Sequence, residues 1–108
     1  MLKTKKIMKV FVQSVNFNAD QELIKFVEEK VKSLEKFHDR IINAEVFLKV
    51  QKTKEKENKI LEAKINIPGS EVVVSKQAKY FEEAMNLASD TLKRQLRRSK
   101  EKPLKIKL

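Results

Sequence analysis

Apolar and polar residues alternate along four stretches of this chain. In the first of them, Met8, Val10 and Val12 share one side, while Lys9 and Phe11 point to the other. A period of two is typical of strands that bury one face, so each stretch predicts a half-buried strand. The four stretches are residues 8–12, 44–51, 61–67 and 71–74.

Two longer segments instead repeat apolar residues at helical spacing, which predicts amphipathic helices. The first runs from Asp20 to about residue 36, and the Asp20 carboxylate is placed to accept hydrogen bonds from the first turn. The second covers residues 79–99 and ends before Pro103, which cannot continue a helix. Its apolar side consists of Phe81, Ala84, Met85, Ala88, Leu92 and Leu96.

The order of these elements is β-α-β-β-β-α, and each has one apolar side. A polar loop at residues 51–59 and the turn at Pro68-Gly69 separate the last three strands, which favours an antiparallel meander. We therefore predict an α+β fold, a two-layer sandwich in which both helices cover one face of a four-stranded sheet. The open face of this sheet would carry Phe11, Phe47 and Val73.

The composition suits one soluble domain. The chain has 108 residues, of which 41% are hydrophobic and 37% charged, and it has no cysteine, which is compatible with a reducing cytosol. No apolar run approaches the ~20 residues that span a bilayer. The apolar stretch after Lys6 is interrupted at Lys9, so it is not a signal peptide. We expect a cytoplasmic protein without membrane contact.

Positive charge is concentrated at the end of the second helix. The net charge is +10, and residues 91–108 hold eight Lys and Arg against the single acid Glu101, a local charge of +7. Most charged runs are only solvated surface, and cations near a helix C-terminus stabilise its dipole. This density is greater than capping requires, so it favours a surface that binds a polyanion, most often nucleic acid. The candidate residues are Lys93, Arg94, Arg97, Arg98 and Lys100.

A weaker set of cations lies on the first helix. Lys25, Lys32 and Lys36 project to a similar side at 100° per residue, although three glutamates are interleaved with them. If the two helices pack side by side, both sets would face outward and form a positively charged ridge. Chance explains this arrangement about as well as design does.

The aromatic residues of the open sheet face have two interpretations. Phe11 and Phe47 are candidates for stacking on unpaired RNA bases. A cross-strand pair that shields part of the sheet explains them better.

Catalysis is poorly supported. His38 is the only histidine, and without cysteine it has no evident partner for nucleophilic catalysis. The carboxylates are scattered and mostly near lysines, so they predict no metal site. The single glycine, Gly69, excludes a glycine-rich phosphate loop. We predict no enzyme, no cofactor, no metal and no small-molecule substrate, but a domain that binds nucleic acid through its backbone.

Three segments carry more specific motifs. They are residues 34–41 (LEKFHDRI), 46–52 (VFLKVQK) and 90–96 (DTLKRQL), the last continued by a basic run to residue 102. The Leu-x-Arg-Gln-Leu pattern at residues 92–96 is the most specific of them. With these motifs, residues 8–102 resemble the ribosome hibernation promoting factor family, also known as ribosome-associated inhibitors.

This resemblance implies a fold similar to double-stranded-RNA-binding domains and a role in translation. Such proteins bind the RNA of the small ribosomal subunit between head and body, occupy the mRNA and tRNA positions, and inhibit translation in resting or starved cells. By matching position, the resemblance assigns RNA contacts to Lys93, Arg94, Arg97, Arg98 and Lys100, and more weakly to Lys25, Lys32 and Lys36.

The chain resembles the short form of that family. It ends soon after the second helix, without the dimerisation domain of the long form or the acidic tail of the member that keeps ribosomes single. The short form implies help in pairing ribosomes, together with a second factor, and a monomer off the ribosome. We expect one ribosome-binding domain over residues 1–108. Residues 1–7 would be an N-terminal extension, unless the start codon is misassigned and the native chain begins at Met8. Residues 103–108 would form a basic tail.

Two other functions stay open. In the first, the domain would be a general binding module for structured RNA. A binding competition between ribosomes and an RNA duplex would distinguish this function from specific ribosome binding. Alternatively, the basic helix would dock an acidic protein partner, in which case the complex would resist RNase.

Overall fold

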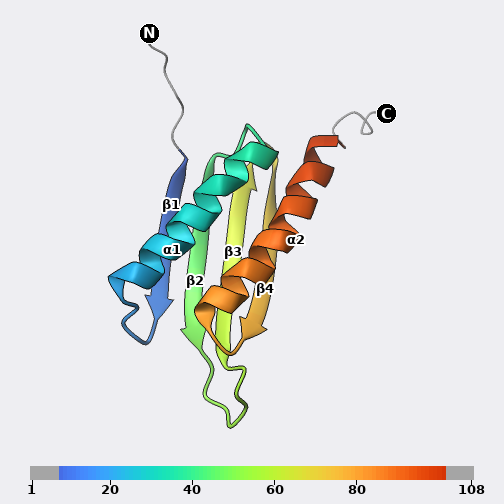
Figure 1. Ribbon diagram of the computed structural model, residues 1–108. Helices are drawn as coiled ribbons and strands as arrows, with labels where there is room; N and C mark the ends of the chain where they lie inside the picture. Colours follow the sequence, from blue (N-terminus) through green and yellow to red (C-terminus); the bar gives the residue numbers. More distant parts are fainter. Residues whose placement is uncertain (1–7, 102–108) are drawn as a thin grey trace.

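The computed structural model describes residues 8–101, with side chains as far as Ser99 (Figure 1). The predicted N-terminal extension and basic tail lie outside the described residues. The order β-α-β-β-β-α is confirmed, with a short 3-10 helix after the first α-helix. The elements are β1 (Lys9–Val15), α1 (Gln21–Lys32), η1 (Ser33–Phe37), β2 (Asn43–Val50), β3 (Lys59–Ile67), β4 (Ser70–Ala78) and α2 (Phe81–Glu101).

The strands form one sheet in the order β1-β2-β3-β4. β1 runs parallel to β2, which requires the crossover that α1 and η1 provide. β2, β3 and β4 pair antiparallel, so the predicted meander is confirmed. Gly69 lies in the turn between β3 and β4 with φ of 74°, a left-handed conformation that favours glycine.

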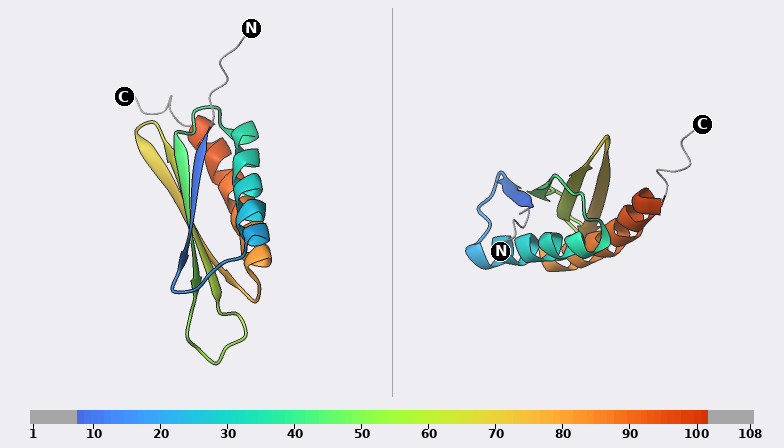
Figure 2. Two further views of the ribbon diagram at one scale, coloured as in Figure 1. Left: turned by 90° about the vertical axis from the view of Figure 1, so that its left-hand side faces the viewer. Right: turned by 90° about the horizontal axis from the view of Figure 1, so that it is seen from above.

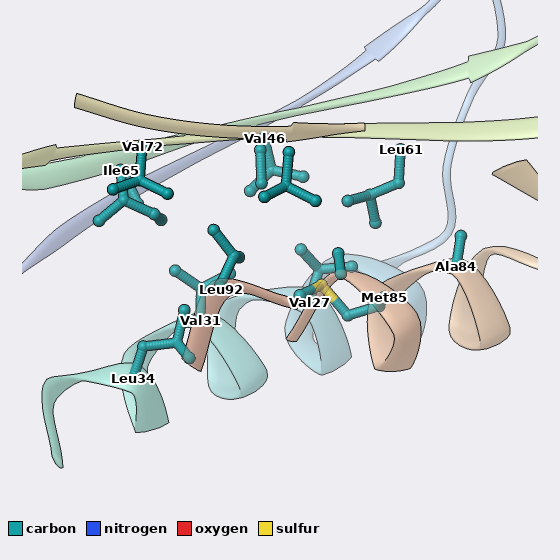
Figure 3. Packing of buried hydrophobic residues seen from close by; sticks show 14 of the residues in the cluster. Val27, Val31, Leu34, Val46, Leu61, Ile65, Val72, Ala84, Met85 and Leu92 are labelled. Carbon is teal, nitrogen blue, oxygen red and sulfur yellow. The ribbon is translucent and has the colours of Figure 1, made fainter. Parts of the chain in front are cut away.

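Both helices cover the same face of the sheet, which confirms the two-layer α+β sandwich (Figure 2). The hydrophobic core lies between the two layers, where side chains of the strands meet those of the helices (Figure 3). The largest fully buried side chains include Leu48, Leu61 and Ile65 from the sheet and Leu34, Met85, Leu92 and Leu96 from the helical layer. This packing holds the polar side of α2 outward.

The start of α1 follows a local signal in the sequence. The Leu23 backbone N–H donates a hydrogen bond of 2.8 Å to Asp20 Oδ1, so the predicted N-cap is confirmed. The carboxylate satisfies one of the N–H groups that have no partner within the first turn.

Replacing this cap is expected to destabilise the fold. Asp20→Ala should lower the free energy of unfolding by about 1 kcal/mol, because the Leu23 N–H loses its acceptor. Asp20→Asn keeps an acceptor oxygen and should lose less than half of that. Chemical denaturation of the three proteins measures the difference, and equal stability of Asp20→Ala and the parent chain would contradict this role.

The end of the first helix differs from the prediction. The α-helix ends at Lys32 rather than near residue 36, and the chain continues as η1. The Ser33 hydroxyl donates a hydrogen bond of 2.6 Å to the Lys30 carbonyl oxygen at this junction. Residues three apart eclipse one another in a 3-10 helix, so Leu34 and Phe37 both turn toward the core.

Three strands are longer than the sequence predicted. β1 extends to Val15, β3 begins at Lys59 rather than at residue 61, and β4 covers Ser70–Ala78 rather than residues 71–74. The added residues of β4 are mostly polar, but their backbone still pairs with β3, with Ala78 opposite Lys59. Pairing with the neighbouring strand, rather than the side-chain pattern, sets this length.

The sheet face away from the helices is open, as predicted. Phe11 is 48% and Val73 57% exposed, while Phe47 is half-buried. The register places Phe11 beside Glu45 and Phe47 beside Gln13. The two phenylalanines are therefore diagonal neighbours on adjacent strands, offset by two residues, and their role in shielding the sheet stays a prediction.

Candidate nucleic-acid interface

The outer side of the C-terminal half of α2 carries a group of cations. Leu92 and Leu96 are fully buried against the core, which turns the intervening residues away from the sheet. In this half of the helix, Arg94, Arg97 and Arg98 are exposed and Lys93 is half-buried. We name these four residues the basic surface. The structure thus brings together four of the five cations predicted on this helix. The fifth is Lys100, whose side chain is not among those that the structure describes.

The basic surface has no acidic residue paired with it within residues 8–99. Residues 91–99 contain no Asp or Glu. The ion pairs found in this range belong to the open sheet face, where Lys49 Nζ lies 3.1 Å from Glu62 Oε1 and Lys64 Nζ 3.8 Å from Glu71 Oε1. Cations gathered on a rigid helix raise the local positive potential, which attracts polyanions.

Phe37 connects the basic surface to the first helical segment. The centroid of its ring lies 5.6 Å from Lys93 Nζ and 4.8 Å from Arg97 Cζ, within the range of cation–π contacts. In Figure 1, the teal end of the first helical segment and the red end of α2 lie at the same end of the molecule. We name Phe37, Lys93 and Arg97 the η1–α2 seam.

Local structure after α1 places Phe37 at this seam. The eclipsed spacing of η1 directs its ring to the same side as Leu34. The chain then extends at His38, which is buried and whose Nδ1 accepts a 3.1 Å hydrogen bond from the Arg40 N–H. In the sequence, Phe37 stood out only as part of the motif at residues 34–41. The seam was not predictable, because no local pattern reports a contact between residues so far apart in the chain.

The lysines of the first helical segment, Lys25, Lys32 and Lys36, are exposed, and their part in a positively charged ridge stays a prediction. α1 ends at Lys32, so the helical step of 100° does not fix the direction of Lys36 in η1. Lys25 lies about two turns before the end of α1, and two glutamates separate it from Lys32. Of the three lysines, Lys36 adjoins the seam, because it precedes Phe37 in the chain.

The first half of α2 carries the opposite charge. A shallow hollow there is lined by Tyr80, Glu82, Glu83, Asn86, Leu87 and Asp90. No sequence pattern pointed to this hollow, because acidic residues near the start of a helix are ordinary. α2 is therefore acidic along its first half and basic along its second, so a polyanion is attracted to one end of the helix.

Other kinds of site have little support in the described structure. Among residues 8–101, no three His, Asp or Glu side chains gather where they could hold a metal ion. No helix in the same range is long and apolar enough to cross a membrane.

Comparison with known proteins identifies relatives along nearly the whole chain. The model of a family described as "Sigma 54 modulation protein / S30EA ribosomal protein" matches residues 10–103. A ribosome hibernation promoting factor of Azotobacter vinelandii is 34% identical over 97 residues, which cover 90% of this chain and 87% of that protein. A protein of the same name from Pseudomonas putida is 35% identical over 95 residues, or 88% of this chain and 89% of that protein.

Solved structures share the fold. The ribosomal subunit interface protein from Coxiella burnetii superimposes with a TM-score of 0.73 at 21% identity, and the Protein Y N-terminal domain of Thermus thermophilus with 0.70 at 22%. Each alignment covers 86% of this chain and 98% of the other. The arrangement of one sheet and two helices is therefore shared with these proteins.

Proposed function

This chain belongs to the family of sigma 54 modulation proteins and S30EA ribosomal proteins, and on that premise we propose that it is a ribosome hibernation factor. We propose that it binds the RNA of the small ribosomal subunit in the mRNA and tRNA channel and inhibits translation in resting or starved cells. The observation that carries the proposal is the basic surface, in a chain similar over most of its length to proteins named for hibernation. A role on ribosomes places the protein in the cytoplasm.

Inhibition by occupying a channel requires binding but no bond making or breaking. Basic side chains that contact phosphates would hold the domain in place without reading base sequence. Each neutralised phosphate releases counterions, so the slope of log K against log salt is about −0.7 to −0.9 per contact. Four contacts from the basic surface would give a slope of about −3.

The charge distribution also gives the domain an orientation in this proposal. The basic surface would face phosphates, together with the predicted contacts Lys36 and Lys100. The acidic half of α2, with Glu82, Glu83 and Asp90, would face away from them because like charges repel. The weaker candidates Lys25 and Lys32 would lie at the edge of the contact.

A general module for structured RNA is the second candidate. Contacts of the basic surface with phosphates alone do not distinguish ribosomal RNA from another duplex.

The first proposal has two further parts. The protein would help to pair ribosomes together with a second factor, and it would be a monomer off the ribosome.

Co-sedimentation with purified small subunits tests the proposed function. We expect the protein to sediment with the subunits, to resist competition by excess generic RNA duplex, and to dissociate as salt rises from about 50 to 200 mM. Displacement by an equal amount of duplex would favour the general RNA module. No binding even at the lower salt would contradict both, and an RNase-resistant complex would indicate a protein partner.

A further inference from the structure

The η1–α2 seam combines two like charges with one aromatic ring. Lys93 and Arg97 are four residues apart on α2, a spacing at which two cations project from the same side and repel each other. The ring of Phe37 lies within 6 Å of both charged groups. The negative face of an aromatic ring attracts cations, so the contact offsets their repulsion and holds them together.

The two sides of Phe37 have different surroundings. The residue is half-buried and packs against the hydrophobic core, which fixes the ring. Its contacts with Lys93 and Arg97 lie at the surface, where Arg97 is exposed. A fixed ring thus provides a rigid support for two side chains that otherwise have many rotamers.

Support of this kind matters when the cations bind phosphate. Free Lys and Arg side chains lose rotamer freedom on binding, and groups that are already ordered lose less. A guanidinium that lies over a ring still presents N–H groups at its edge, which can donate to phosphate oxygens. Arg94 and Arg98 differ, since within residues 8–99 neither is in contact with an aromatic ring.

We propose that Phe37 is a positioning residue for RNA binding, whose ring holds Lys93 and Arg97 as a preorganised pair for phosphate groups. This inference rests on the proposed function, because it assumes that the basic surface meets ribosomal RNA. It adds the apolar residue Phe37 to the proposed RNA-binding site, which the sequence motif and the charge pattern had limited to cations.

The chain contains a matched control for this role. Lys30 Nζ lies 5.9 Å from the ring centroid of Phe26 on α1, a cation–π contact outside the basic surface. Phe26, like Phe37, is half-buried and packs against the core. Phe26→Leu therefore removes a comparable ring, with a comparable loss of packing, but leaves the seam intact.

Binding to small subunits separates positioning from packing. Phe37→Leu should weaken binding about three- to ten-fold, since two ring contacts disappear, whereas Phe37→Tyr should stay within about two-fold of the parent chain. Phe26→Leu should bind like the parent. Thermal unfolding of each variant checks that the domain is folded at the assay temperature. Unchanged affinity of Phe37→Leu, or an equal loss in Phe26→Leu, would overturn the proposal.

A double-mutant cycle shows whether Phe37 acts through the two cations. In the background Lys93→Gln with Arg97→Gln, Phe37→Leu should change affinity by less than about two-fold. The same three- to ten-fold loss in that background would overturn a positioning role and leave only packing.

The contact is also measurable without ribosomes. The side-chain protons of Lys93 and Arg97 should show ring-current shifts in the NMR spectrum of the free protein, and Phe37→Leu should abolish them. A parent chain that shows these shifts but does not bind subunits would refute the proposed function, whereas binding without these shifts would refute the inference about Phe37.

Discussion

Replacing Arg94, Arg97 and Arg98 together with glutamine is expected to reduce affinity for small subunits by about 100-fold or more near 150 mM salt. Three charged contacts with phosphate, each contributing about 1 kcal/mol, account for a loss of this size. The slope of log K against log salt should also fall by about 2 to 3. All three side chains are exposed, so the thermal stability of the domain should change little.

A variant with the same change in charge shows whether the location of the cations matters. Lys52, Lys54 and Lys56 are exposed in the loop between β2 and β3, at the opposite end of the molecule from the basic half of α2 (Figure 1). Replacing these three lysines with glutamine should cost less than about three-fold in affinity. Similar losses in the two variants would indicate that net charge, rather than the basic surface, governs binding.

The largest effect on stability is expected for Leu92→Ala. Leu92 is fully buried, and it packs the basic half of α2 against the core (Figure 3). Removing its side chain leaves a cavity between the two layers, which should lower the free energy of unfolding by about 2 to 5 kcal/mol. Chemical denaturation measures this loss.

Leu87 on the same helix provides the control, because it is 45% exposed beside the acidic hollow. Leu87→Ala makes the same chemical change and should alter the free energy of unfolding by no more than about 0.5 kcal/mol. Equal losses for the two variants would contradict the described orientation of α2.

Much of the fold was predictable because local patterns determine it. Alternation identified the strands, helical spacing identified both helices, and the cap of Asp20 is a contact within one turn. Four of the cations on the last helix were also predictable, because the apolar stripe around Leu92 and Leu96 dictates which side faces outward. Their role in binding RNA stays a prediction.

The remaining features depend on contacts between distant segments. Backbone pairing with β3 extends β4 through polar residues that have no strand pattern of their own. The register of β1 on β2, which offsets Phe11 from Phe47, follows from packing of the whole layer. The contact of Phe37 with α2 requires both the 3-10 turn of η1 and the placement of α2, and no local motif encodes either.

In the resulting molecule, α2 has an acidic half and a basic half and packs on the sheet. The core fixes which side of α2 is outward, and Phe37 supports the cations nearest η1. In the proposed function, the basic half meets ribosomal phosphates, while the acidic half and the open sheet face point elsewhere.

Directed hydroxyl-radical probing on the small subunit tests this orientation most directly. The chain has no cysteine, so Gln95→Cys on the basic half of α2 and Ser75→Cys on the open sheet face each create a single site for an iron chelate. If the basic surface meets ribosomal RNA, the probe at position 95 should cleave small-subunit RNA strongly and the probe at position 75 weakly. Stronger cleavage from position 75, or none from position 95, would contradict the account.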